Sequence, residues 1–424
     1  MIVTKNRKLR SGKGAMIIYV ILFLQCNSLF FLLSIPRGSR LLVIIEVLLM
    51  AFYLIVNNNT VKRVCNVTLS GRYVICFCLC AILSVVPCYI YRGQPIFDSV
   101  KGILPFLILL YYFVLFKSNV SERQLVRFLV FVALCKFVIL LFQQFTYPTF
   151  WFNAYKEGDI SNYGVPYQVE IRSGIYRFLL GMIYILYFAG FYLTYRYLTS
   201  NRKVKYIILF GCVVIGIYFE QFRYNMFVFL LCWLWLNFRS RKSKISFMHV
   251  LLVIIPLCVL YAYFDFLFGA LVERTETEVT EDYMRFYGTY FYLFEYWKGP
   301  LTVLFGNGYP VEGSRYWKET TYFEQANNNF RVDIGLVGTV NIYGFFFLFI
   351  FILYFYRLYK NWKYIDFPLK AYLLWLGGML PLYMPIHYTT DANLFMAGLF
   401  YLIDKSILRN INTSKCLVEK TNPS

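Results

Sequence analysis

Residues 202–244 read RKVKYIILFGCVVIGIYFEQFRYNMFVFLLCWLWLNFRSRKSK. Two apolar runs, 206–219 and 226–238, are joined by a short polar turn and are flanked at their outer ends by basic residues. Each run is short for a membrane span, but boundaries taken from sequence are uncertain by about 2–4 residues. That margin brings both runs to the length that a bilayer requires. The stretch therefore predicts two antiparallel transmembrane helices whose outer ends share one side of a membrane.

The same charge pattern recurs along the whole chain and predicts its orientation. About 12 apolar stretches are separated by loops that alternate between basic and mixed charge. With the N-terminus inside, the inner loops collect nearly two-thirds of the 42 basic residues and only four acids, Glu122, Asp366, Asp404 and Glu419. Because positively charged loops resist translocation, we expect this side to be cytoplasmic.

The composition excludes an ordinary soluble domain. Of 424 residues, 59% are hydrophobic, 21% are aromatic and only 15% are charged. The net charge of +20 is explained by the basic inner loops, so nucleic acid is not an expected partner. The basic N-terminus precedes an apolar run that leads directly into a second one, which predicts a first transmembrane helix rather than a cleaved secretory signal.

The sequence thus predicts an all-α, polytopic integral membrane protein. We expect a single membrane domain over residues 1–424, about 12 transmembrane helices, cytoplasmic N- and C-termini, and one large extracytoplasmic loop at 271–333 between helices 9 and 10. A second long extracytoplasmic connection is expected at 146–174. The expected spans are 16–35, 41–56, 73–91, 103–116, 125–145, 175–195, 206–219, 226–238, 248–270, 334–356, 368–386 and 392–404.

The large loop is predicted to have internal order. Apolar and aromatic residues at 283, 287, 290, 291 and 294 fall on one helical face, which predicts an amphipathic helix at the membrane interface. After Gly299-Pro300 an apolar run is predicted to be a strand, and it ends in a glycine-rich turn. An asparagine-rich stretch then precedes the return to the membrane.

Several short motifs occur in a defined order on this predicted outer face. They are Phe222-Arg223-Tyr224-Asn225 in a short hairpin, Arg285 before the aromatic helix, Leu-Phe-Gly-x-Gly at 304–308, Asp-x-Gly-Leu-x-Gly at 333–338 and Tyr-Gly at 343–344. In this order the chain resembles the O-antigen polymerase and ligase superfamily of bacterial envelope glycosyltransferases, over roughly 205–350. The ligase branch usually carries a His-Asn pair before the return to the membrane. This chain has Asn327-Asn328-Asn329 there, which favours a polymerase.

The resemblance implies an enzyme of the bacterial inner membrane that joins lipid-linked oligosaccharide repeat units. The glycan would move from an undecaprenyl pyrophosphate carrier to a sugar hydroxyl of another unit, in the synthesis of O-antigen, capsule or exopolysaccharide. The implied partners are the undecaprenyl-pyrophosphate-linked oligosaccharide and membrane lipids, with a chain-length regulator as a further candidate. No Asp-x-Asp motif and no phosphate-binding Gly-Lys-Ser/Thr loop occurs, so we expect no metal and no cofactor.

Arginines on the predicted outer face suit a pyrophosphate leaving group. Their guanidinium groups are permanently charged and bind phosphate oxygens in bidentate geometry, and stabilising the developing negative charge is a large catalytic effect. We expect Arg223 and Arg285 to act in catalysis and Arg172, Arg177 and Arg331 to bind substrate. The alternatives are lipid-headgroup contacts for the first pair of binding arginines, an ion pair with Glu220 for Arg223, a solvated helix face for Arg285, and loop ion pairs with Asp333 or Glu324 for Arg331.

A general base and a sugar-binding surface complete the predicted site. Glycosyl transfer needs a carboxylate or histidine near the acceptor hydroxyl. The candidates are Glu220, Asp333 and His387, and then Asp282, Glu324 and Asp391. Asp333 could instead cap a helix. Tyr309 and Trp317 are expected to stack on sugar rings, with interface anchoring as the alternative.

One further pair is predicted inside the membrane. Glu46 and Lys136 both fall in apolar spans, where ionisable groups are rare and usually paired, so they are candidates to pair with each other.

Three other functions remain open from the sequence. These are an O-antigen ligase acting on the lipid A core, a polysaccharide flippase or transporter, and a non-catalytic partner in envelope assembly. The missing internal repeat and the single oversized loop disfavour a transporter.

Overall fold

The structure is a computed structural model, and it describes residues 13–25, 40–147, 149, 170–172, 175–178, 182–200, 203–239, 286–327, 329–386 and 389–421. Within these ranges the chain is mostly helical, as predicted. The α-helices are α1 (Lys13–Gln25), α2 (Arg40–Val56), α3 (Asn58–Val67), α4 (Ser70–Leu83), α5 (Val85–Arg92), α6 (Ile96–Leu107), α7 (Tyr111–Lys117), α8 (Glu122–Thr146), α9 (Ile183–Thr199), α10 (Lys203–Glu220), α11 (Arg223–Arg239), α14 (Pro300–Phe305), α15 (Arg315–Ala326), α16 (Gly335–Lys360), α17 (Phe367–Met379) and α18 (Thr390–Thr421).

Short 3-10 helices continue or precede several of these elements, residues 286–290 are also helical, and a two-stranded sheet is formed by residues 170–177. The 3-10 helices are Ile108–Leu110, Arg331–Ile334 and Trp362–Tyr364, and a π-helix covers Phe291–Glu295. The antiparallel strands β1 (Glu170–Arg172) and β2 (Ile175–Arg177) pair with Arg172 opposite Ile175 and Glu170 opposite Arg177.

Four helices in the described part of the chain are long and apolar enough to cross a membrane. They cover Ser70–Arg92, Ile96–Lys117, Glu122–Thr146 and Arg331–Lys360. Large apolar side chains such as Phe131, Phe145 and Phe349 are exposed on these helices, as expected for faces that contact lipid rather than water. The predicted span at 248–270 lies outside the described residues.

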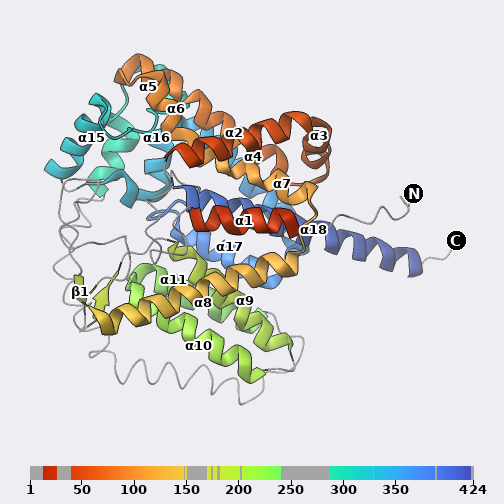
Figure 1. Cartoon of the computed structure of the whole chain (residues 1–424). Helices are drawn as coiled ribbons and strands as arrows, with labels where there is room; N and C mark the ends of the chain where they lie inside the picture. The colour runs from red at the N-terminus through yellow and green to blue at the C-terminus, as the bar shows by residue number, and fades with distance from the viewer. Residues whose placement is uncertain are drawn as a thin grey trace.

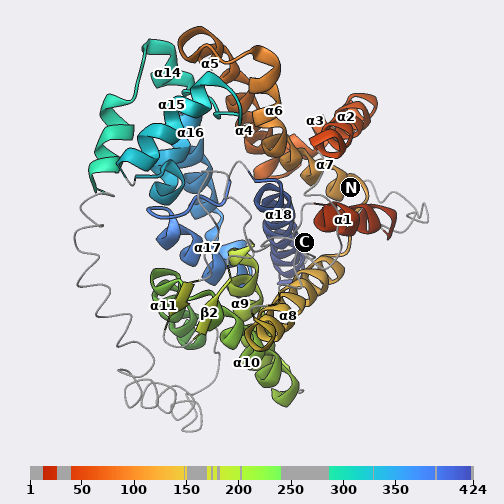
Figure 2. The same ribbon diagram turned by 60° about the vertical axis from the view of Figure 1, so that its left-hand side comes forward.

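The helices form two groups separated by α17 and α18 (Figures 1 and 2). One group contains α4, α5, α6, α14, α15 and α16, and the other contains α8, α9, α10 and α11. Helix α17 packs on α9 and α11, whereas α18 packs on α7. Stacked rings of Tyr187 in α9 and Trp375 in α17, 4.4 Å between centroids, join the second group to the centre.

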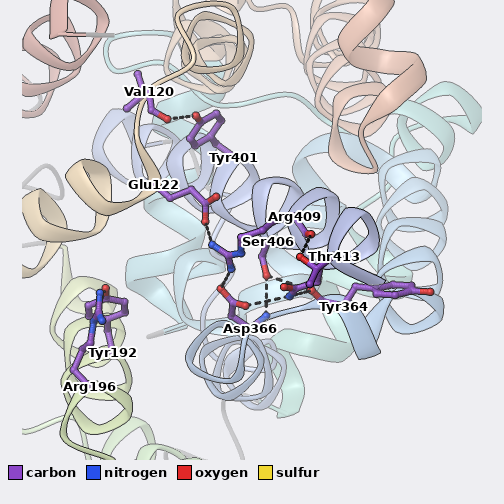
Figure 3. A network of polar contacts seen from close by, with 11 residues as sticks. Val120, Glu122, Tyr192, Arg196, Tyr364, Asp366, Tyr401, Ser406, Arg409 and Thr413 are labelled. Carbon is purple, nitrogen blue, oxygen red and sulfur yellow. Dashed lines mark hydrogen bonds and ion pairs between the residues drawn. The ribbon is translucent and has the colours of Figure 1, made fainter. Parts of the chain in front are cut away.

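Different elements lie on opposite sides of the molecule. In Figure 1 the β-hairpin and α15 lie at the left, whereas the C-terminal part of α18 projects at the right. On the right-hand side a polar network surrounds Arg409, which pairs with Glu122 at 2.7 Å and with Asp366 (Figure 3). This network connects the beginnings of α8 and α17 to α18.

A buried carboxylate fastens α18 to the start of α4. Asp404 is 1% exposed and accepts hydrogen bonds from the backbone N–H groups of Leu69, 3.1 Å, and Ser70, 3.0 Å. The hydroxyl of Tyr112 in α7 donates to the same carboxylate at 2.6 Å. The first N–H groups of a helix have no partner within that helix, so Asp404 acts as a cap supplied from a distant segment.

A break in α16 holds the large loop against the membrane helices. Gly344 has φ +83°, so the helix is interrupted there and the carbonyl groups of Asn341 and Ile342 become available. The backbone N–H groups of Asn307 and Gly308 donate to these two carbonyls, each at 2.9 Å. The Leu-Phe-Gly-x-Gly turn therefore supplies the hydrogen bonds that the broken helix lacks.

Only glycine fits where these two backbones meet. A Cβ atom on Gly306 would lie 2.0 Å from the carbonyl oxygen of Ile342, and one on Gly344 would lie 2.2 Å from that of Leu304. Both glycines also have a positive φ, +86° and +83°. Two motifs that are about 40 residues apart in the sequence thus form one packed unit.

One element type and two element boundaries predicted from the sequence are wrong. The run after Gly299-Pro300 is helix α14 rather than a strand, because Pro300 occupies the first helical turn, where its missing N–H costs nothing. The span expected at 175–195 begins at Ile183, since β2 uses residues 175–177. The span expected at 368–386 is shorter, because α17 ends at Met379. The predicted aromatic helix is confirmed over its described residues, 286–295.

We predict that Gly306→Ala destabilises the protein more than Gly313→Ala does. Both residues have φ +86°, so each substitution adds about 1 kcal/mol of backbone strain. A Cβ on Gly313 has no atom within 4 Å, whereas that on Gly306 collides with Ile342, which adds about 1–3 kcal/mol. Thermal unfolding of the two purified variants in detergent measures the difference, and equal shifts in melting temperature would contradict the proposed packing.

Candidate functional site

The predicted tight hairpin is confirmed as a turn between two helices. Helix α10 ends at Glu220 and α11 begins at Arg223, so only Gln221 and Phe222 connect them. Gln221 has φ +50°, which allows the tight reversal. Glu220 is buried at 2% exposure and Arg223 is half-buried with contacts inside the protein. The turn places a carboxylate and a guanidinium at the same end of the helix pair.

Lys136 of α8 forms an ion pair with Glu220. The ammonium group contacts Oε1 of the carboxylate, and both side chains are almost completely buried. The predicted pairing of Lys136 with Glu46 stays a prediction, because the side chain of Glu46 lies outside the described part of the structure. The charge on Lys136 is compensated from α10, which packs directly on α8.

Arg177 approaches the same helix end from the β-hairpin. Its Nε donates to the carbonyl oxygen of Glu220 at 3.2 Å, and its guanidinium lies over the ring of Phe222, 4.4 Å from the centroid. The hairpin is held in place by Gln144 of α8, which accepts a hydrogen bond from the backbone of Tyr176 at 3.0 Å. Arg172 lies on the neighbouring strand, where only its backbone is described.

We call Lys136, Arg177, Glu220 and Arg223 the hairpin cluster. It contains three cationic side chains and one carboxylate. Among the described residues, no hydrogen-bond donor reaches Oε2 of Glu220, although this atom is buried. The buried hydroxyl of Tyr187 also has no hydrogen-bond partner there, and it lies within electrostatic range of Glu220. A buried carboxylate whose second oxygen has no donor among the described residues, with cationic side chains on the same helix ends, is suited to accept a proton.

A second group of buried polar residues lies where the large loop meets α5. We call Arg92, Asn307, Tyr316, Glu324 and Arg331 the loop cluster. Arg92 is 5% exposed, and its guanidinium donates to Oδ1 of Asn307 at 2.7 and 3.0 Å. The same group lies over the ring of Tyr296, 4.1 Å from the centroid, and 5.1 Å from that of Tyr316.

Arg331 completes the loop cluster from the opposite side. Its Nε lies 3.2 Å from Oε1 of Glu324, which confirms one of the two ion pairs considered from sequence. Its NH1 donates to the Tyr316 hydroxyl at 3.0 Å. Burial raises the pKa of Tyr316 to about 12, against the opposing effect of Arg331, so this hydroxyl stays protonated at neutral pH. Arg331 is thus a structural partner within the loop as well as a predicted binding residue.

Sequence reasoning did not single out Arg92 or Asn307 as site residues, and it considered Tyr316 only among the aromatic rings of the loop that could stack on sugars. Arg92 was the end of a predicted span, where such a residue usually reaches lipid headgroups. The glycine that follows it, Gly93, adopts φ +64° and ends the helix, which turns the chain toward the loop. An arginine followed by such a glycine at the outer end of a span was the available signal.

The other predicted residues lie apart from these clusters or outside the described part of the chain. Asp333 is exposed in a 3-10 turn and does not cap α16, whose preceding residue is Ile334. Tyr309 and Trp317 are half-buried on the loop. Asp391 accepts a hydrogen bond from the Tyr184 hydroxyl at 3.0 Å. Arg285, Asp282 and His387 belong to residues that the structure does not describe, as does the side chain of Glu46.

The chain was compared with known proteins at three levels. No protein-family model, no curated protein and no solved structure matches it.

We predict that removing only one charge of the Lys136–Glu220 pair destabilises the protein more than removing both charges. Lys136→Met removes the ion-pair partner of the buried Glu220, so the free energy of unfolding should fall by about 3–5 kcal/mol. The double variant Lys136→Met/Glu220→Leu removes both charges and should recover most of that loss. Melting temperatures of the purified proteins in detergent provide the measurement.

The matched control for this cycle is Lys101→Met. Lys101 pairs with Asp98 at 2.8 Å, but the two side chains are 29% and 32% exposed. Breaking this pair should cost about 1 kcal/mol or less. A double variant as unstable as Lys136→Met would show that the two charges do not stabilise each other.

Proposed function

We propose that this protein is a membrane glycosyltransferase that polymerises oligosaccharide repeat units carried on undecaprenyl pyrophosphate. The observation that carries the proposal is the hairpin cluster, in which Lys136 pairs with the buried carboxylate of Glu220, Arg177 donates to the backbone at the same helix end, and Arg223 begins the helix that follows. The order of sequence motifs that resembles the O-antigen polymerase and ligase superfamily provides the second line of support.

The hairpin cluster has the chemistry that a pyrophosphate leaving group requires. Arg177 and Arg223 would bind its oxygens and stabilise the negative charge that develops as the glycosyl bond breaks. Arg177 is held by the Glu220 carbonyl and the Phe222 ring, so its guanidinium is oriented before substrate arrives. The turn lies at the end of two apolar helices; if these cross the membrane as proposed, it would lie near the surface where a lipid-linked pyrophosphate is held.

Glu220 is the proposed general base. Lys136 contacts one carboxylate oxygen, while the other oxygen has no donor among the described residues. In the proposed step the acceptor hydroxyl transfers its proton to Glu220 as its oxygen bonds to the anomeric carbon. The bond from that carbon to the phosphate oxygen breaks, and undecaprenyl pyrophosphate leaves with the electron pair.

The packing of the loop supports the same proposal. The glycine turn and the break in α16 bring two of the family-like motifs into direct contact. A third, the asparagine-rich stretch, packs against the aromatic helix, since a Cβ on Gly288 would lie 1.9 Å from Oδ1 of Asn329. That helix and α15 present exposed rings of Phe286, Tyr290 and Tyr322, which suit stacking on sugar rings.

We predict that Arg223→Gln and Arg177→Gln lower polymer formation by about 10²–10³-fold with normal protein level, because each removes a donor to the developing charge. The assay follows polymer length when the purified protein acts on lipid-linked repeat units. Arg315→Gln is the control, since Arg315 has a side chain that is 85% exposed on α15 and lies outside both clusters. Equal loss in all three variants, or in none, would contradict the assigned roles.

The surface-polysaccharide ladder of a deletion strain separates the proposal from its alternatives. A lipid A core that carries a single repeat unit means that units are flipped and attached but not polymerised, as proposed. A bare core with polymer remaining on the carrier lipid would instead identify a ligase. A bare core with units retained on the cytoplasmic side would identify a flippase. Complementation with Arg223→Gln should fail to restore the ladder, whereas Arg315→Gln should restore it.

A further inference from the structure

A basic cavity lies at the opposite ends of the helices that carry the hairpin cluster. It has a volume of about 600 Å³ and is formed by α8, α9 and α10. Four cationic side chains line it, Arg123, Arg127, Arg196 and Lys205, and its lining contains no carboxylate. The topology expected from the loop charges places this end of the helices in the cytoplasm. The cavity is therefore separate from the proposed catalytic site, and all of its charged lining residues are cationic.

The four cations are not neutralised by neighbouring acids. In the described part of the chain, none of them lies within 4 Å of a carboxylate oxygen in a salt bridge. Glu122 directly precedes Arg123, but Glu122 and Asp366 both pair with Arg409 (Figure 3). Both acids are thus paired with Arg409 and not with the cations of the cavity.

Arg196 is positioned by its own helix. Its Nε donates to the Tyr192 hydroxyl at 3.0 Å, and the two side chains are drawn together in Figure 3. Within the described ranges, its two terminal nitrogens have no hydrogen-bond acceptor. A guanidinium fixed through Nε with free terminal donors has the geometry that binds phosphate oxygens.

The spacing of the α8 arginines points the same way. Arg123 and Arg127 are four residues apart and share one helical face, where two like charges destabilise a helix. Both side chains are exposed. An anion held between α8 and α9 would remove this repulsion.

The remainder of the cavity is apolar. Val130, Leu193 and Leu209 line it together with the rings of Tyr192 and Tyr206. A soluble anion would not contact these apolar surfaces, whereas a phospholipid carries a phosphate next to a glycerol and its acyl chains. Basic pockets between membrane helices on the cytoplasmic side are known to suit anionic lipid headgroups.

We propose that this cavity binds the phosphate of an anionic phospholipid from the membrane leaflet on its side. The headgroup phosphate contacts Arg127 and Arg196, with Arg123 and Lys205 adding attraction, and the first part of the acyl chains lies along the apolar surfaces. The bound lipid joins α8, α9 and α10 at the end remote from the hairpin cluster. Because α8 and α10 also carry Lys136 and Glu220, occupancy stabilises the same three-helix unit.

The test uses the full-length protein, purified and delipidated in detergent, with phosphatidylglycerol as the probe. Native mass spectrometry and thermal unfolding report binding, and phosphatidylcholine and inorganic phosphate are the comparison ligands. We expect phosphatidylglycerol to be retained and to raise the melting temperature. Arg123→Gln/Arg127→Gln should weaken this binding about 30-fold at low salt, and Arg196→Gln should weaken it about 5-fold or more.

The control variant is Lys62→Gln/Arg63→Gln, which removes the same charge from exposed positions on α3. It should bind phosphatidylglycerol like the unsubstituted protein. Equal weakening in the control would show general attraction to surface charge and would overturn the site. Stabilisation by inorganic phosphate that matches that by phosphatidylglycerol would assign the cavity to a soluble phosphate instead. Unchanged binding in the two cavity variants would also reject the proposal.

Discussion

The arrangement of the large loop depends on one backbone contact, the meeting of the Gly306–Gly308 turn with the break in α16. A helix that enters an apolar environment must satisfy its carbonyl groups, and the positive φ of Gly344 leaves two of them without partners in the helix. The turn satisfies both. A Cβ atom fits neither at Gly306 in the turn nor at Gly344 in the helix. The turn can therefore pack against α16 in only one register. The loop cluster follows from that register, since Asn307 in the turn binds Arg92.

Two different solutions to burying charge occur in this molecule. In the loop cluster, Arg92 and Arg331 each donate to at least two acceptors among amide, carbonyl, hydroxyl and carboxylate oxygens, and both lie over tyrosine rings. In the hairpin cluster, Lys136 and Glu220 pair closely, but the second carboxylate oxygen has no donor among the described residues. Fully satisfied polar networks favour rigidity, whereas an unsatisfied buried group is a feature of sites that bind or react. The contrast is why the hairpin cluster is the better candidate for chemistry and the loop cluster for support.

Sequence patterns succeeded where one helix or one turn decided the outcome. The apolar runs on either side of Gln221 predicted the α10–α11 hairpin, and the aromatic periodicity predicted the helix at 286–295. The patterns failed where the contacts of a residue depend on a segment far away in the sequence. Lys136 and Glu220 are 84 residues apart, and no pattern in the sequence indicated that they pair. The β-hairpin at 170–177 was also missed, because its short strands carry no clear alternation of polar and apolar residues.

The sequence by itself determined that this chain is a helical protein with spans that can cross a membrane, and it located the motifs that resemble an envelope glycosyltransferase. Those properties depend on local composition and periodicity, which a bilayer or a helix responds to directly. Only the tertiary structure decided which charges meet, that Arg92 belongs with Arg331, and that a basic cavity forms between α8, α9 and α10. Those features require side chains from helices far apart in the chain, and their contacts are set by packing rather than by spacing in the sequence.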